Sequence, residues 1–112
     1  MNKAIFLDRD GVLNYDLGYV FKKTDFKIID GVIDSLKFFQ EKNFLLIIVT
    51  NQSGIGRGYY STEAFWALND FMIDIFKKES VNIHDVIFCP HLPEANCNCR
   101  KPRTGMIDLA VS

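Results

Sequence analysis

Asp8 and Asp10 stand two positions apart in the segment Phe6-Leu-Asp-Arg-Asp-Gly-Val-Leu13, just after a short apolar run. A carboxylate in such a place can attack a phosphoryl group, provided that a cation neutralises the crowded negative charge. The second carboxylate can protonate the leaving oxygen and later deprotonate the attacking water. Gly11 allows the chain to turn away sharply behind them. The pattern alone is equally compatible with an ordinary turn rich in Asp and Gly at the end of a strand.

All three cysteines of the chain lie in one short segment that also holds a histidine, and the four residues are Cys89, His91, Cys97 and Cys99. An odd number of cysteines in one tight cluster is a poor disulfide framework and a better metal site. Three thiols and one imidazole form a complete tetrahedral set for Zn²⁺. Because protein groups fill every position, we expect a structural zinc that fixes loop 89–99. The alternative is three reduced cysteines and a surface histidine without metal.

The segments that must position these residues alternate between strand and helix patterns. Short apolar runs predict buried parallel strands at residues 3–7, 44–49 and 85–89. Helical spacing of apolar residues predicts a helix over 31–43 capped by Asp30, and a longer one that starts at Ser61. A last helix is expected from Thr104. This alternation predicts an α/β fold, a doubly wound, Rossmann-like parallel sheet.

The predicted sheet brings several polar residues to one edge. Ligands of such sheets bind beyond the carboxyl ends of the strands. Asp8, Thr50 and Cys89 all stand at those ends, which predicts one site there. Gly54 and its neighbours Gly56 and Gly58 are expected to break regular structure after the second strand. His84 is interpreted as a loop residue before the third.

Length and composition describe one ordinary globular domain. The chain has 112 residues and a formal net charge of −1. This charge gives no electrostatic reason to expect nucleic acid or an anionic membrane as a partner. The longest apolar stretch, residues 44–49, is too short to span a bilayer, and residues 1–8 do not form a signal peptide. A cytoplasmic protein is the default expectation.

Three segments together resemble the haloacid dehalogenase superfamily of phosphohydrolases. The first is Asp8-x-Asp10-Gly-Val-Leu13, the second is Thr50-Asn51 at the end of the second strand, and the third is Lys101. The resemblance implies that Asp8 is a nucleophile that forms an aspartyl-phosphate and that Asp10 is the general acid and base. It also implies Mg²⁺ bound by the Asp8 side chain and the Asp10 backbone carbonyl.

Within this superfamily the chain resembles the D-glycero-D-manno-heptose 1,7-bisphosphate 7-phosphatases. The matching segments are 6–14, 16–20, 49–59, 89–91 and 97–102. The resemblance implies removal of the 7-phosphate from a small-molecule sugar bisphosphate, in lipopolysaccharide core or nucleotide-activated heptose biosynthesis, by a protein that is monomeric at full length. It implies substrate contacts at Asp16, Gly18, Tyr19, Thr50, Asn51, Gln52, Ser53, Arg100 and Lys101.

Two alternatives stay open. Histidinol-phosphate phosphatase shares the Asp-x-Asp motif and the Cys/His loop, and the short gap between His91 and Cys97 suits it. The segments 16–20 and 52–58 favour the heptose enzyme instead. The other alternative is an inactive, zinc-stiffened module that binds sugar phosphate. Because an inactive binder has no chemical reason to keep both Asp8 and Asp10, we favour an enzyme.

The superfamily's fourth motif, an acidic pair after a fourth strand, is not found. Asp108 falls on the presumed last helix and is a poor substitute. We therefore expect residues 1–112 to form a phosphatase core that lacks its C-terminal strands, with strand 3–7 paired on one side only. Such a chain should bind Mg²⁺ weakly, turn over slowly, and tend to dimerise through the open edge.

Overall fold

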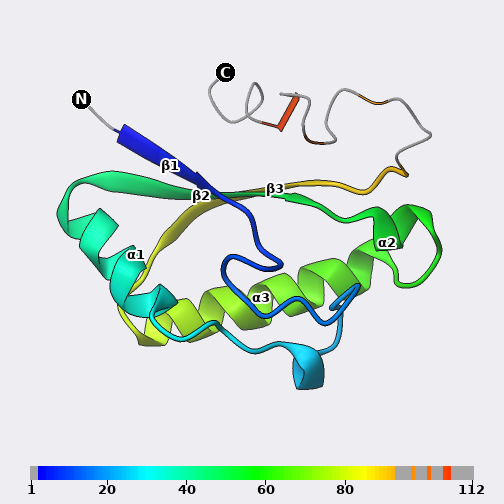
Figure 1. Ribbon diagram of the computed structural model, residues 1–112, viewed down its shortest axis with the longest axis horizontal. Coiled ribbons are helices and arrows are strands. Elements are labelled where there is room, and N and C mark those ends of the chain that lie inside the picture. Colours follow the sequence, from blue (N-terminus) through cyan, green and yellow to red (C-terminus); the bar gives the residue numbers. More distant parts are fainter. Residues whose placement is uncertain (1–2, 93–96, 98–100, 102–104, 107–112) are drawn as a thin grey trace.

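A computed structural model describes residues 3–92, 97, 101 and 105–106 of the chain. Its three strands, β1 (Lys3–Leu7), β2 (Phe44–Asn51) and β3 (Ile83–Cys89), form one parallel sheet in the order β1-β2-β3. The connecting segments hold η1 (Lys23–Asp25), α1 (Val32–Glu41), α2 (Ser53–Gly56) and α3 (Thr62–Lys78). Figure 1 shows α1 and α3 below the sheet. The predicted α/β fold with a parallel sheet is confirmed.

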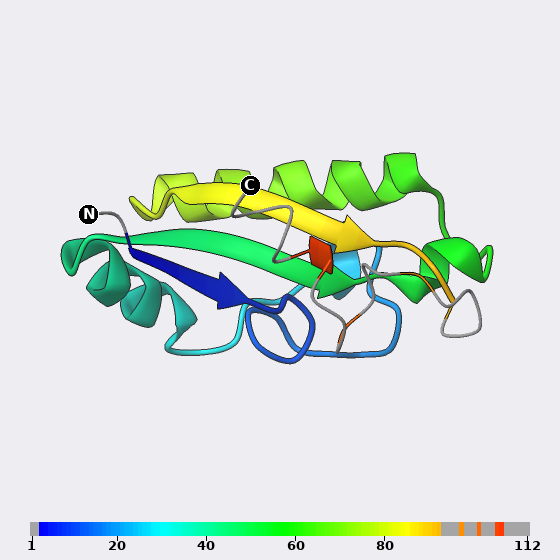
Figure 2. The same ribbon diagram turned by 90° about the horizontal axis from the view of Figure 1, so that it is seen from above.

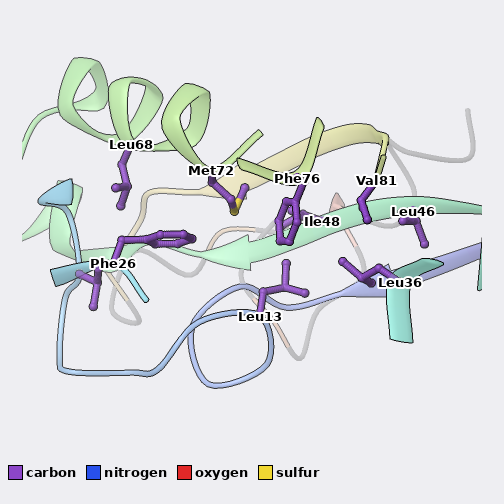
Figure 3. Packing of buried hydrophobic residues seen from close by; sticks show 10 residues of the cluster. Leu13, Phe26, Leu36, Leu46, Ile48, Leu68, Met72, Phe76 and Val81 are labelled. Atoms are coloured by element: carbon purple, nitrogen blue, oxygen red, sulfur yellow. The ribbon is translucent and has the colours of Figure 1, made fainter. Parts of the chain in front are cut away.

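The larger hydrophobic core lies between the sheet and its two long helices. Leu68, Met72 and Phe76 of α3 point towards the sheet, where Phe76 lies next to Ile48 of β2 (Figure 3), and all four side chains are buried. The spacing of the three α3 residues places them on one face of the helix. The opposite face of β2 carries Ile47 and Val49, which pack with Cys89 and Met106. Because both faces of β2 are covered, its sequence is a continuous apolar run.

The two long helices begin differently. Ser61 caps α3 as predicted, because its Oγ accepts a hydrogen bond from the Ala64 backbone N–H at 3.0 Å. The expected cap of α1 by Asp30 is wrong. The N-cap residue is Gly31, which has a φ of 90° and makes no side-chain capping bond. A glycine adopts this left-handed conformation without steric cost, so the chain enters α1 through a turn rather than through an Asp cap.

Strand β3 begins two residues earlier than predicted and includes His84, which is therefore not a loop residue. The pairing shifts between Leu46 and Ile47, because Ile83 pairs with Leu46 while Asp85 pairs with Ile47. His84 is the extra residue of this bulge. The polar residues His84 and Asp85 interrupt the apolar run at the start of β3, so the sequence pattern did not show where the strand begins.

The amino end of the sheet is braced by Gln40. Its Nε2 donates to the Ser80 carbonyl at 3.0 Å, and its Oε1 accepts from the Asn82 backbone N–H at 2.6 Å. These contacts tie the end of α1 to the turn between α3 and β3. The brace lies at the end of the sheet opposite to the carboxyl ends of the strands.

Strand β1 lies at one edge of the sheet (Figure 2) and, among the described residues, pairs only with β2. No helix within the described part of the chain is long and apolar enough to cross a membrane. The predicted helix from Thr104 lies mostly outside the described residues, as does Asp108.

Candidate active site

A cavity of about 380 Å³ lies beyond the carboxyl ends of β1 and β2. The residues that line it are Asp8, Asp10, Asp16, Gly18, Tyr19, Asn51, Gln52, Ser53 and Tyr60. The sequence predicted a site at this edge of the sheet, and most of the predicted residues meet there. Tyr60 was not predicted, and neither was the role of Arg9 described below.

The Asp8 carboxylate follows β1 directly and reaches the cavity with 42% of its side chain exposed. Its Oδ1 accepts a hydrogen bond from the Arg9 backbone N–H at 2.8 Å. Its Oδ2 lies 3.1 Å from Lys101 Nζ. The same ammonium donates to the Val49 carbonyl at 3.0 Å. Asp8 is thus an accessible carboxylate with a cation beside one oxygen.

Asn51 holds Lys101 in this place through the backbone of the lysine. Asn51 Oδ1 accepts from the Lys101 N–H at 3.0 Å, and Asn51 Nδ2 donates to the Lys101 carbonyl at 3.5 Å. The end of β2 therefore positions a residue fifty positions further along the chain. Asn51 was predicted to contact substrate, and the structure shows that its amide also positions the cation next to Asp8.

The Asp10 carboxylate is surrounded by donors. Oδ1 accepts from Arg9 Nε at 3.1 Å and from Asn14 Nδ2 at 3.0 Å. Oδ2 accepts from Arg9 Nη2 and from Gln52 Nε2, each at 3.1 Å. The Arg9 side chain is only 3% exposed, so the ion pair with Asp10 balances a buried positive charge. Arg9 Nη2 also donates to the Val20 carbonyl at 2.8 Å.

Gln52 connects this ion pair to the end of β2. Its Nε2 donates to Thr50 Oγ1 at 3.0 Å as well as to Asp10. Its Oε1 accepts from the Tyr60 hydroxyl and, at 3.4 Å, from Arg9 Nη2. Thr50 is fully buried and is not among the residues that line the cavity, although it was predicted to contact substrate.

Tyr60 is buried next to this network. Burial raises the pKa of its hydroxyl from 10.0 to about 12, an effect opposed by the charge of Arg9 and reinforced by that of Asp10. Tyr60 therefore keeps its proton at any ordinary working pH and acts as a donor to Gln52. Its ring stacks on Phe21 at 5.1 Å between centroids.

The outer wall of the cavity is a loop that turns through two residues in the left-handed conformation, of which only Tyr19 is not a glycine. Gly18 and Tyr19 both have positive φ, at 84° and 51°, and Asp16 Oδ1 stabilises the turn by accepting from the Gly18 N–H at 3.0 Å. The Tyr19 ring is exposed and meets Tyr59 edge-on, with centroids 4.9 Å apart. Arg57 lies over the Tyr19 ring at 5.9 Å. Aromatic faces and a cation thus stand at the mouth of the cavity.

Three of the four predicted zinc ligands meet after β3. Cys89 Sγ lies 3.5 Å from His91 Nδ1 and 3.5 Å from Cys97 Sγ, and the three ligand atoms all lie within 4.8 Å of one another. The predicted ligand Cys99 and the predicted substrate contact Arg100 lie outside the described residues.

The chain that leads into this cluster is attached to the end of β2. The Gln52 backbone N–H donates to the Cys89 carbonyl at 2.7 Å, and the Gly56 N–H donates to the Pro90 carbonyl at 3.0 Å. A Cβ on Gly56 would lie 2.7 Å from the Pro90 oxygen, so only glycine permits this approach. The cysteine–histidine cluster and the cavity are therefore parts of one hydrogen-bonded unit.

Solved structures share this fold. The chain superposes with a TM-score of 0.88 on a D,D-heptose 1,7-bisphosphate phosphatase from B. bronchiseptica solved with magnesium and phosphate, which is 32% identical; the match covers 97% of this chain and 62% of that one. A HAD-like phosphatase from Mesorhizobium loti also gives a TM-score of 0.88, at 31% identity over 97% of this chain and 56% of the other. The fold is thus that of the haloacid dehalogenase-like phosphatases.

A family model described as polynucleotide kinase 3 phosphatase matches residues 4–112, and the chain belongs to this family. A D-glycero-beta-D-manno-heptose-1,7-bisphosphate 7-phosphatase from Haemophilus influenzae is 46% identical, over 99% of this chain and 64% of its own length. A D-glycero-alpha-D-manno-heptose-1,7-bisphosphate 7-phosphatase from Campylobacter jejuni is 49% identical, over 94% of this chain and 60% of its own length. The chain thus spans somewhat less than two thirds of these two relatives. The predicted resemblance is confirmed.

Proposed function

We propose that this chain carries the catalytic core of a magnesium-dependent phosphatase that removes the 7-phosphate of D-glycero-D-manno-heptose 1,7-bisphosphate. The observation that carries the proposal is the pair of carboxylates on one cavity, with an exposed Asp8 next to Lys101 and an enclosed Asp10. The names of the similar enzymes from Haemophilus influenzae and Campylobacter jejuni support the choice of substrate.

The proposed reaction has two steps. First an Asp8 oxygen attacks phosphorus, the bond between phosphorus and the sugar oxygen breaks, and Asp10 gives its proton to that oxygen. A water molecule then attacks the aspartyl-phosphate, Asp10 takes up the proton, and inorganic phosphate leaves with Asp8 restored. The Lys101 ammonium, 3.1 Å from Asp8, reduces the repulsion between the carboxylate and the phosphate oxygens.

Oxygen donors at the cavity suit magnesium. The Asp8 carboxylate is half exposed there, and carboxylate and carbonyl oxygens are the ligands that Mg²⁺ prefers. We propose that the Asp8 side chain and the Asp10 carbonyl hold the ion. When bound, Mg²⁺ would act as a Lewis acid and neutralise negative charge on the phosphoryl oxygens. The neighbour from B. bronchiseptica, solved with magnesium and phosphate, supports this choice of metal.

The cysteine–histidine cluster suits zinc in a structural role. Sulfur and imidazole nitrogen are the donors of structural zinc sites, and three such atoms already lie within 4.8 Å of one another. We propose that Cys89, His91 and Cys97, together with Cys99, bind one Zn²⁺. The ion would bind the reduced cluster, since thiolates are the ligands. Its effect would be to hold the segment that presents Lys101 to Asp8.

The remaining cavity residues are proposed to bind the sugar and its phosphates. Asp16, Gly18 and Tyr19 lie on the outer wall, and Ser53 begins α2 at the cavity. Hydroxyl, backbone N–H and cationic groups are suitable donors to phosphate oxygens. We also propose that Arg100 contacts the substrate, because segment 97–102 resembles the family's motif.

The proposed substrate is tested by a panel of phosphate esters. Phosphate release would be measured with the β and α anomers of the heptose bisphosphate, histidinol phosphate and a 3′-phosphorylated oligonucleotide, each with Mg²⁺ or with a chelator. We expect Mg²⁺-dependent release from a heptose bisphosphate and none from the Asp8→Asn variant. Preferred hydrolysis of the oligonucleotide, which the family description suggests, or of histidinol phosphate would replace the proposed substrate. Binding of the heptose bisphosphate without any release would favour the inactive sugar-phosphate-binding module.

A further inference from the structure

The hydrogen bonds of the Gln52 side chain are all made within the protein. An amide has two N–H donors and one carbonyl acceptor. Both hydrogens of Nε2 are engaged, one by Asp10 Oδ2 at 3.1 Å and the other by Thr50 Oγ1 at 3.0 Å. The Oε1 atom accepts from Tyr60 and Arg9. Gln52 is also only 2% exposed, so its amide has little capacity left for a substrate.

The orientation of the Gln52 amide follows from the chemistry of its four partners. Arg9 can only donate, so it must face Oε1, and the Tyr60 hydroxyl donates to the same atom. The Asp10 carboxylate is an acceptor and faces Nε2. Burial raises the Tyr60 pKa to about 12, so the hydroxyl keeps the proton that it donates. A rotation of the amide by 180° would oppose donor to donor and acceptor to acceptor.

Gln52 is one of two anchors of the Asp10 Oδ2 atom. Oδ1 is held by Arg9 Nε at 3.1 Å and by Asn14 at 3.0 Å. Oδ2 accepts from Gln52 Nε2 at 3.1 Å and from Arg9 Nη2, which also donates to the Val20 carbonyl at 2.8 Å. Without the Gln52 contact, Oδ2 would keep only the donor that Arg9 shares with Val20, so the carboxylate would be held less firmly on this side.

Tyr60 is held in place by its surroundings. A Cβ added to Gly54 would lie 2.2 Å from Tyr60 Cε1, so the ring packs directly on the glycine backbone. The ring also stacks on Phe21, with an interplanar angle of 11°. Gly54 was expected only to break regular structure, yet its missing side chain makes room for the tyrosine that orients Gln52.

We propose that Gln52, oriented by Tyr60 and Arg9, is a positioning residue that fixes the Asp10 carboxylate for proton transfer, rather than a substrate contact. This inference rests on the proposed role of Asp10 as acid and base in a phosphatase. It assigns Tyr60 to the same positioning network. The Gln52 amide thereby connects Arg9 and Asp10, in the segment that follows β1, to the residue that follows β2.

The experiment compares two esters that differ in the leaving group. A sugar phosphate releases an alkoxide that needs a proton, whereas p-nitrophenyl phosphate releases a phenolate that needs almost none. We expect Gln52→Met to lower kcat/KM about 10–100-fold more for the sugar phosphate than for the nitrophenyl ester, as lost proton transfer predicts. Tyr60→Phe should act in the same direction by about 3-fold. Equal losses for both esters, or a raised KM with unchanged kcat, would mean that Gln52 binds substrate or only supports the fold.

Gln40→Met is the matched control. It makes the same substitution at a glutamine that bridges Ser80 and Asn82 at the other end of the sheet. It should lower the melting temperature and leave the ratio of the two kcat/KM values unchanged. A change in that ratio similar to the change in Gln52→Met would show that the ratio reports on general loosening of the fold.

A second measurement is independent of activity and separates the two proposals. Nuclear magnetic resonance of the Gln52 side-chain amide should show protons that exchange slowly with water, and Asp10→Asn or Tyr60→Phe should speed this exchange at least several-fold. If the chain releases no phosphate from either ester, the proposed function fails while the amide measurement still tests the network. Fast exchange in the unmodified protein would refute the positioning role.

Discussion

Asp8 and Asp10 lie two residues apart on the same cavity, yet the protein holds them in opposite ways. Asp8 is 42% exposed, and the lysine that forms an ion pair with it, Lys101, comes from a distant segment. Asp10 is 20% exposed and is enclosed by donors from Arg9, Asn14 and Gln52. A nucleophile must be reached by the phosphoryl group, whereas an acid–base group needs a fixed direction. The two environments match these different demands.

The largest expected effect is on turnover in Asp8→Asn. The amide is a far weaker nucleophile of nearly the same size, so phosphate release should fall to background. Because Asp8 is half exposed, the free energy of unfolding should change by less than about 0.5 kcal/mol. Phosphate assays and urea denaturation would check both statements. Near-normal turnover in this variant would remove the aspartyl-phosphate mechanism.

Asp10→Asn should instead lower both activity and stability. Turnover should fall about 10²–10⁴-fold, the usual contribution of acid–base catalysis. The buried Arg9 would lose its counter-ion and Gln52 would face an amide, so we expect a loss of about 1–3 kcal/mol in the free energy of unfolding. The same assays apply. A stability equal to that of Asp8→Asn would show that the two carboxylates do not differ in the way described.

Loss of the proposed zinc should affect the Asp8 side of the site more than the Asp10 side. Protein prepared with a reductant should contain about one zinc per chain by elemental analysis, and Cys97→Ser should lose it and melt at a lower temperature. We expect turnover to fall about 10-fold through poorer placement of Lys101, with the Gln52 amide protons unchanged. Zinc-free protein from a preparation without chelator would exclude the site.

The last prediction concerns stability alone and involves no change in turnover: the effect of Tyr60 at high pH. The folded protein binds the Tyr60 proton more tightly than the unfolded chain, with a pKa of about 12 against 10.0. This stabilisation is therefore complete below about pH 10 and is lost as the pH rises towards 12. The difference in unfolding free energy between the unmodified protein and Tyr60→Phe should shrink by about 2–3 kcal/mol across this window. If the difference stays constant between pH 10 and 12, burial does not raise the pKa of Tyr60.

The sequence predicted the frame of the site better than its internal contacts. Strand β1 was predicted from its apolar run, and the cap of α3 was predicted from the preference of serine for the N-cap position. Both are local signals in the sequence. Helix α2 was not predicted from the sequence, because Gly54 and Gly56 are residues that disfavour a helix. In the structure these glycines allow close approaches to Tyr60 and to the Pro90 carbonyl, and such contacts depend on segments that only the fold brings together.

Arg9 and Tyr60, both missed from the sequence, differ in whether a local signal for them exists. Arg9 has one, because a cation between two aspartates after a buried strand is visible in the sequence. Tyr60 carries no such signal, since its contact with Gln52 depends on the turn of α2 and on the stacking with Phe21. Asn51 was predicted from its motif to face the substrate, but its contacts with the Lys101 backbone depend on a pairing far along the chain.

The end of the sheet that Gln40 braces is a suitable attachment site for a label or a tether, because it lies away from the cavity. It joins Ser80 and Asn82 at the amino ends of the strands. Strand β2 has eight residues, so about 25 Å of chain separates this end from the cavity. A fluorescent label, a surface tether or a short inserted peptide in the turn at Asn43 would therefore leave the mouth of the cavity open to solution. An immobilised form of the protein should be built from that turn.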